Sequence, residues 1–148
     1  MSKYSVRNVK TFRGMDCPGF NCSLYKDGKR VGEVDNDGSG GETCFWFKDR
    51  NEKNEFEAYV KSLPPVHYPP TAASSDDGLT LEMSGDLYVD QLLEEHDLAK
   101  KCRKKTLFRK PGEEGWYYLN RPFGPEEKAW LVAKYGKDVE ILNERLTA

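Results

Sequence analysis

The chain has 148 residues, a net charge of −2, and 37% hydrophobic against 32% charged residues. This length accommodates one ordinary domain or two minimal ones, and the near-zero net charge excludes a global electrostatic attraction to nucleic acid or membranes. Three Trp, eight Tyr and seven Phe exclude a disordered chain, because each buried aromatic side chain removes a large area from water.

Residues 1–63 predict an antiparallel β-meander with one helix. Strand-like composition marks the segments 4–12 and 43–47, and 31–34 is the expected return strand of a hairpin. The segment 20–25 also shows the period of two residues that is typical of a half-buried strand. Asp49 predicts a helix N-cap, with Glu52 as its capping-box partner. The helix that follows has one apolar stripe, formed by Phe56, Tyr59, Val60 and Leu63.

The Asp-Gly pair at 27–28 predicts a hairpin between the second and third strands. A three-residue loop would place Phe20 opposite Val34, whereas a two-residue loop would place Leu24 opposite Val31. We favour the three-residue loop, because it puts a large apolar pair on one face of the sheet.

Residues 64–78 predict a Pro-rich linker. Four prolines in the seven residues 64–70 remove backbone donors and favour an extended polyproline path. At roughly 3.1 Å per residue, the proline segment could span about 20 Å. We therefore expect a stiff connection between two small subdomains, 1–63 and 79–148.

Residues 79–148 predict a second α+β unit. Its expected elements are a helix beginning at Ser84 or Asp86, a hairpin with strands 106–109 and 116–119, a helix beginning at Pro125, and a last helix beginning at Asp138. Pro125 suits the first helical position, because Pro fixes φ and lacks an N–H that would be unpaired there. We expect Trp130 and Ala133 to face inward. The expected fold class of the whole chain is α+β.

Two groups of residues could suggest a metal site. The segment 35–40 has the oxygen ligands and the glycine that open an EF-hand calcium loop, but position twelve is Trp46 instead of Glu. Four further side chains are possible zinc ligands: Cys17, Cys22, Cys44 and His67. They lack the second closely spaced pair that structural zinc sites show. We therefore expect no metal and no cofactor.

The sequence contains no motif typical of catalysis. It has no phosphate-binding glycine loop, no nucleophile elbow and no helix with paired histidines. Outside the carboxylates, only His67 in the Pro-rich segment and His96 on a helix could serve as a base for a nucleophile. We therefore expect a protein that is not an enzyme.

The location of the protein follows from two further patterns. No segment approaches the roughly 18 consecutive apolar residues of a membrane-spanning helix, and the N-terminus lacks the apolar core of a signal peptide. We therefore expect a cytoplasmic protein without a membrane partner. In that compartment its cysteines are expected to be reduced: Cys17, Cys22, Cys44 and Cys102.

The most distinctive charge pattern is a basic run at 100–110, which holds seven cations and no acid. Aromatic residues lie in or just after it: Phe108, Trp116, Tyr117 and Tyr118. Cations that bind anions, next to rings that can stack, are typical of a contact surface. The run also has a simpler interpretation, because residues 76–97 hold eight acids and no base and a helix favours a basic C-terminal end. Both interpretations stay open at this point.

Three segments carry a resemblance to known proteins: 10–15, 24–29 and 104–109. They resemble segments of uncharacterised small proteins of bacteria, phages and plasmids. The resemblance covers both units, and its motifs are turns, a strand and a hairpin, so it implies no activity and no site residue. It implies a context in which compact proteins of mobile elements block larger macromolecular complexes. An anti-defence protein that inhibits a bacterial defence system would be one example.

Together these observations predict a non-catalytic binding protein that occupies a surface of a protein or ribonucleoprotein partner. The expected partner-binding residues combine the Arg and aromatic types that dominate binding hot spots: Arg103, Lys104, Lys105, Arg109, Trp116, Tyr117 and Tyr118. One alternative is direct binding of single-stranded nucleic acid through the same patch. A weaker alternative is a small-molecule sponge that holds a nucleotide between the two units.

Overall fold

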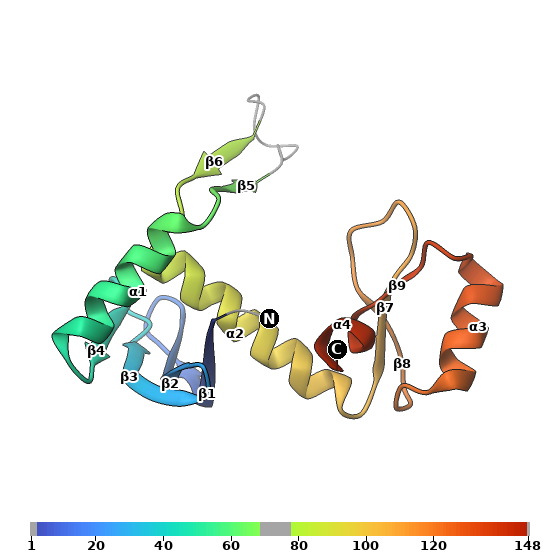
Figure 1. The fold of residues 1–148 in the computed structure, drawn as a ribbon, viewed down its shortest axis with the longest axis horizontal. Helices are drawn as coiled ribbons and strands as arrows, with labels where there is room; N and C mark the ends of the chain where they lie inside the picture. The colour runs from blue at the N-terminus through green and yellow to red at the C-terminus, as the bar shows by residue number, and fades with distance from the viewer. Residues whose placement is uncertain (1–2, 69–77, 148) are drawn as a thin grey trace. The chain divides into compact units, whose positions relative to one another are not determined.

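The computed structural model describes residues 3–68 and 78–147 (Figure 1). The chain divides between Leu93 and Glu94 into two compact units, which we call the N-terminal unit and the C-terminal unit. The N-terminal unit contains a four-stranded antiparallel sheet with helices, and the C-terminal unit contains a small three-stranded sheet with helices. The predicted α+β fold class is confirmed.

The N-terminal unit is built on an antiparallel meander with the strand order β1-β2-β3-β4. Its elements are β1 (Tyr4–Arg13), β2 (Pro18–Lys26), β3 (Lys29–Asn36), β4 (Cys44–Phe47), α1 (Arg50–Ser62), β5 (Val66–Tyr68), β6 (Leu79–Leu81) and the first half of α2 (Gly85–Cys102). The meander and the helix predicted from residues 1–63 are thus confirmed, with strands slightly longer than expected.

The hairpin between β2 and β3 differs from the favoured prediction. Its loop has two residues, Asp27 and Gly28, both with positive φ (49° and 83°), and Lys26 pairs with Lys29. Two positive φ angles give the two-residue loop the same twist as the flanking strands. This preference outweighs the pairing of Phe20 with Val34, for which the three-residue loop was favoured. A bulge then shifts the register, so that both Val31 and Val34 are buried although they lie three residues apart.

The helix α1 begins as the sequence predicts. The Asp49 carboxylate accepts a hydrogen bond of 2.9 Å from the backbone N–H of Glu52, which confirms the N-cap. The Glu52 carboxylate does not complete a capping box but accepts a hydrogen bond from the Lys26 ammonium at 2.7 Å. Phe56 and Val60 are buried, so the predicted stripe faces the core.

The helix α2 contributes to the N-terminal core, which the sequence did not predict. Tyr88, Val89 and Leu92, in its first half, are buried in the same apolar cluster as the meander residues. The expected division into 1–63, a linker at 64–78 and 79–148 therefore differs from the structure. A buried helical stripe shows that a face is covered, but it does not show which element covers it.

The Pro-rich segment also differs from the expected stiff linker where the structure describes it. Strand β5 pairs antiparallel with β6, with Val66 opposite Leu81 and Tyr68 opposite Leu79. Residues 66–68 and 79–81 thus lie side by side, which an extended spacer between two units would not allow. Residues 69–77 lie outside the described residues.

The C-terminal unit places a three-stranded sheet, with the order β8-β7-β9, next to two further helices (Figure 1). Its elements after α2 are β7 (Thr106–Arg109), β8 (Tyr117–Leu119), α3 (Pro125–Tyr135), β9 (Glu140–Ile141) and α4 (Leu142–Thr147). Phe108, Leu131 and Ile141 form its buried apolar cluster. The predicted order of helix, hairpin, helix and helix is confirmed, but the last helix begins at Leu142 instead of Asp138, because the short β9 precedes it.

The helix α3 confirms one prediction and corrects another. Pro125 occupies the start of the helix, as predicted. The expectation that Trp130 and Ala133 face inward is wrong, because Trp130 is 46% exposed and Ala133 is exposed as well. Leu131 is fully buried in their place, and Tyr135 follows one turn later at the edge of the core. The apolar face of α3 is therefore rotated by about one residue from the expected face.

Candidate binding surface

The acidic loop that resembles a calcium site uses its oxygens within the loop. The Asn36 side-chain oxygen accepts from the Gly38 N–H at 2.9 Å, and the Asp37 carboxylate accepts from the hydroxyl of Ser39 at 2.6 Å and from its N–H at 2.9 Å. The hydrogen bond from the Ser39 hydroxyl, and to a lesser extent the one from its N–H, lowers the pKa of Asp37. Within residues 3–68 and 78–147, no three His, Cys, Asp or Glu side chains are grouped as a metal site would require.

The possible zinc ligands and bases lie in separate environments. Cys22 is buried, and burial raises the pKa of its thiol to about 11, so it behaves as a small apolar side chain. Cys17 and Cys44 are exposed. The Nδ1 atom of His67 forms a hydrogen bond of 2.8 Å with the Thr80 hydroxyl. His96 is half-buried on α2.

The β7–β8 hairpin brings the predicted contact residues together but divides them between two faces. Leu107 pairs with Tyr118, and Phe108 pairs with Tyr117. Because side chains alternate across a strand, Tyr117 and Tyr118 lie on opposite faces of the hairpin. The predicted set of seven residues is therefore not a single surface, and Tyr117 is the residue that lies apart.

One face of the hairpin carries two ring–cation pairs. The Lys105 ammonium lies 4.3 Å from the centre of the Tyr118 ring, and the Arg109 guanidinium lies 4.2 Å from the centre of the Trp116 ring. Tyr118 is 61% exposed, and Trp116 is half-buried. We call Lys105, Arg109, Trp116 and Tyr118 the basic hairpin face.

Arg109 is the most constrained cation of this face. Its guanidinium also pairs with Glu140 at 3.4 Å, and Glu140 pairs in turn with Arg145 at 2.7 Å. Within the described part of the chain, the Arg109 Nε atom is buried and has no hydrogen-bond partner. Because Nε is buried, an anionic group of a partner could accept hydrogen bonds only from the terminal N–H groups of this guanidinium.

A buried side-chain amide holds the backbone of the turn that carries Arg103 and Lys104. Asn143, at the start of α4, is 3% exposed, and its side-chain oxygen accepts from the Leu107 N–H at 2.8 Å. Its amide nitrogen donates to the carbonyls of Cys102 (3.1 Å) and Lys105 (2.9 Å). One side chain thus joins the end of α2, the basic turn and the start of β7. Arg103 and Lys104 themselves are exposed.

The other face of the hairpin carries a second group of rings and cations, contributed by Lys110 directly after β7, by β8 and by α3. We call it the α3-side cluster: Lys110, Tyr117, Trp130, Lys134 and Tyr135. The Lys110 ammonium lies 4.2 Å from the Tyr117 ring centre and 5.4 Å from that of Tyr135. The Lys134 ammonium lies 4.7 Å from the Trp130 ring centre and 5.5 Å from that of Tyr135.

The sequence analysis missed most of this cluster. It named Tyr117, but it assigned Trp130 to the core and did not consider Lys134 or Tyr135. One available signal was the spacing of Trp130 and Lys134, four residues apart and so on one side of a helix. A second signal was the adjacency of Tyr117 and Tyr118, which in a strand must point to opposite faces.

Comparisons with known proteins add no family to this description. No protein-family model, no curated protein and no solved structure matches the chain. Across the residues that the structure describes, no helix has both the length and the apolar composition needed to cross a bilayer.

Proposed function

We propose that this chain is a non-catalytic binding protein that acts by occupying an acidic surface of a protein or ribonucleoprotein partner. The observation that carries the proposal is the pairing of Lys105 with Tyr118 and of Arg109 with Trp116 on one exposed face. Arg103 and Lys104, on the adjoining turn, extend that face. Tyr117 is not part of it.

The geometry favours binding because the contact groups are held in position before a partner arrives. A Lys or Arg that rests on a ring has fewer rotamers to lose, and the ring loses few in any case. The buried Asn143 amide fixes the backbone beneath Lys105. Such rigid aromatic and Arg side chains are what binding hot spots consist of.

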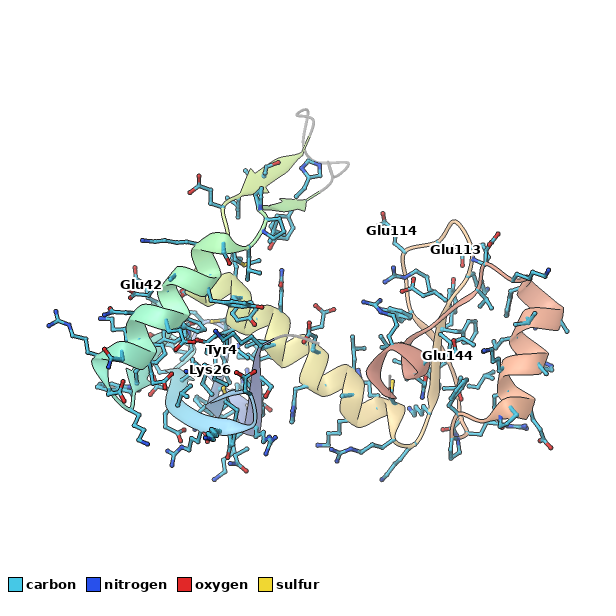
Figure 2. All side chains as sticks on the ribbon, viewed as in Figure 1. Tyr4, Lys26, Glu42, Glu113, Glu114 and Glu144 are labelled. Carbon is cyan, nitrogen blue, oxygen red and sulfur yellow. The ribbon has the colours of Figure 1, made fainter. Side chains whose placement is uncertain are left out.

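The charge of this face selects the partner. Within residues 3–68 and 78–147, no carboxylate lies within ion-pair distance of Arg103, Lys104 or Lys105. An acidic partner could therefore form ion pairs with these three cations without breaking an existing ion pair. Glu113 and Glu114 project from the loop between β7 and β8, as Figure 2 shows, so the cationic contact is confined to the strands and the turn.

The experiment is affinity capture from the native host with the tagged full chain, with and without nuclease. The test variant is Arg103→Gln/Lys104→Gln/Tyr118→Ala, and the control is Lys48→Gln/Lys53→Gln/Tyr68→Ala, which removes the same number of positive charges and one tyrosine ring elsewhere. The proposal predicts a partner that the wild-type chain and the control retain and the test variant loses. Equal capture by the test variant and the control would contradict it.

Two further expectations belong to this proposal. All four cysteines are free thiols, which supports a location in the reducing cytoplasm. The resemblance to proteins of phages and plasmids supports a component of a bacterial defence system as the partner, with inhibition by occupying its surface. Identification of the captured partner tests both expectations.

A further inference from the structure

The α3-side cluster is accessible although its base lies against the core. Trp130 is 46% exposed and Tyr117 is 41% exposed. Tyr135 stacks on the buried Phe108 ring at 5.4 Å, and Tyr117 stacks on the same ring at 5.9 Å. Phe108 thus fixes the two rings between which Lys110 lies. The cluster is an exposed surface on a rigid base.

The two lysines of this cluster lack acidic partners. In the described part of the chain, no carboxylate lies within ion-pair distance of Lys110 or Lys134, whereas Lys128 on the same helix pairs with Glu144 at 2.6 Å. Each of the two lysines instead lies between two rings. Rings therefore alternate with lysines that have no carboxylate partner, in the order Tyr117, Lys110, Tyr135, Lys134 and Trp130.

The outermost ring of the cluster, Trp130, lines a cavity. Its volume is about 640 Å³, and its lining is Leu119, Asn120, Arg121, Glu126, Glu127 and Trp130. Arg121 and Glu127 lie 4.0 Å apart in this lining and partly neutralise each other. The Asn120 amide can both donate and accept hydrogen bonds. A base stacked on Trp130 would thus find space and polar partners on one side and the Lys134 charge on the other.

We propose that the α3-side cluster binds single-stranded nucleic acid, on a surface separate from the basic hairpin face. A single strand supplies phosphates and unstacked planar bases in alternation, and it can therefore satisfy the lysines and the rings together. An acidic peptide would satisfy only the lysines and would leave the exposed rings of Tyr117 and Trp130 without a stacking partner. A duplex keeps its bases stacked on one another and offers the rings nothing.

The proposal goes beyond the proposed function, because it concerns other residues and another class of partner. The two surfaces can be separated in one assay. The α3-side variants are Lys110→Gln/Lys134→Gln and Trp130→Ala, with Trp130→Phe as the conservative replacement. The matched controls are Arg103→Gln/Lys104→Gln on the other surface and Lys48→Gln/Lys53→Gln in the N-terminal unit, each with the same change in charge.

The test is fluorescence anisotropy of labelled single-stranded DNA and RNA of about 20 nucleotides, titrated with the full chain from about 50 mM salt upward. For Lys110→Gln/Lys134→Gln we expect the slope of log affinity against log salt to become shallower by about 1.4, since each phosphate contact contributes about 0.7 for a single strand. For Trp130→Ala we expect affinity to fall about fivefold or more, and for Trp130→Phe we expect most of it to return.

Three outcomes would overturn the proposal. One is no binding by the wild-type chain at about 50 mM salt. Another is an equal loss of affinity in the N-terminal control, which would show attraction by net charge alone. The third is a loss confined to Arg103→Gln/Lys104→Gln, which would assign nucleic-acid binding to the other surface. Thermal unfolding of each variant identifies any loss of affinity that arises from unfolding.

Discussion

The two units differ in where most of their aromatic contacts lie. In the N-terminal unit the rings contact one another inside the core, as with Tyr4 and Phe56, whose ring centres lie 5.1 Å apart, and Phe56 and Tyr88 at 5.9 Å. Among the described residues of the C-terminal unit, five rings contact cations, as with Tyr118 and Lys105. In the N-terminal unit two described rings do so, Tyr25 with Arg7 and Tyr59 with Lys3. Rings in a core stabilise the fold, whereas rings that carry cations at the surface are available to a partner. The larger number of ring–cation pairs in the C-terminal unit supports the proposal that the binding residues lie there.

The largest effect should come from removing a ring of the N-terminal core. Phe56 is 2% exposed and contacts the rings of Tyr4, Phe45, Phe47 and Tyr88. Phe56→Ala should lower the free energy of unfolding by about 3–5 kcal/mol, through lost transfer energy and a cavity. Denaturant unfolding followed by circular dichroism measures it. A loss below about 1 kcal/mol would contradict the assignment of these rings to the core.

The next effect concerns the amide that holds the basic turn in the C-terminal unit. Asn143→Leu leaves the Leu107 N–H and two carbonyls without their partner, and each unsatisfied buried group costs about 1–3 kcal/mol. We expect faster amide hydrogen exchange at Leu107 and weaker capture of the partner. Asn143→Asp keeps an acceptor for the Leu107 N–H but places a buried carboxyl group against two carbonyl oxygens, so its effect should be at least as large. Unchanged exchange at Leu107 in both variants would show that the amide does not hold the turn.

A smaller effect depends on pH and belongs to the N-terminal unit. Hydrogen bonds from Lys26, and then from Lys3, lower the pKa of Glu55 from 4.5 to about 2. The depressed pKa means that this contribution to stability is complete above about pH 4.5 and is lost as the pH falls toward 2. Unfolding at pH 6 and at pH 3 should therefore differ more for the wild-type chain than for Glu55→Gln. The exposed neighbour Glu57→Gln is the control, and an equal pH dependence in Glu55→Gln would contradict the account.

Much of the fold was predictable because its signals are local. The N-cap of Asp49, the turn at Asp27 and the helix start at Pro125 each depend on a few neighbouring residues. The register bulge and the place of α2 were not predictable, because they depend on what packs against Val31 and Tyr88.

The candidate site was predictable in composition but not in arrangement. The basic run and the rings are visible in the sequence, and the structure keeps Lys105 and Tyr118 together on the surface. Their division between two faces depends on the pairing of Leu107 with Tyr118, and the pairing of strands is not a local property. The spacing of Trp130 and Lys134 indicates that they share one side of α3, and the burial of Leu131 shows that this side lies at the surface.

The central claim is that the rings and cations of the basic hairpin face and of the adjoining turn serve binding and not folding. The variant that tests it should have the smallest effect on stability. The measurement is the free energy of unfolding of Arg103→Gln/Lys104→Gln/Tyr118→Ala, made together with capture of the partner. The account predicts a change in stability within about 0.5 kcal/mol, as for ordinary surface substitutions, together with loss of the partner. A large loss of stability, or a partner that is still captured, would contradict it.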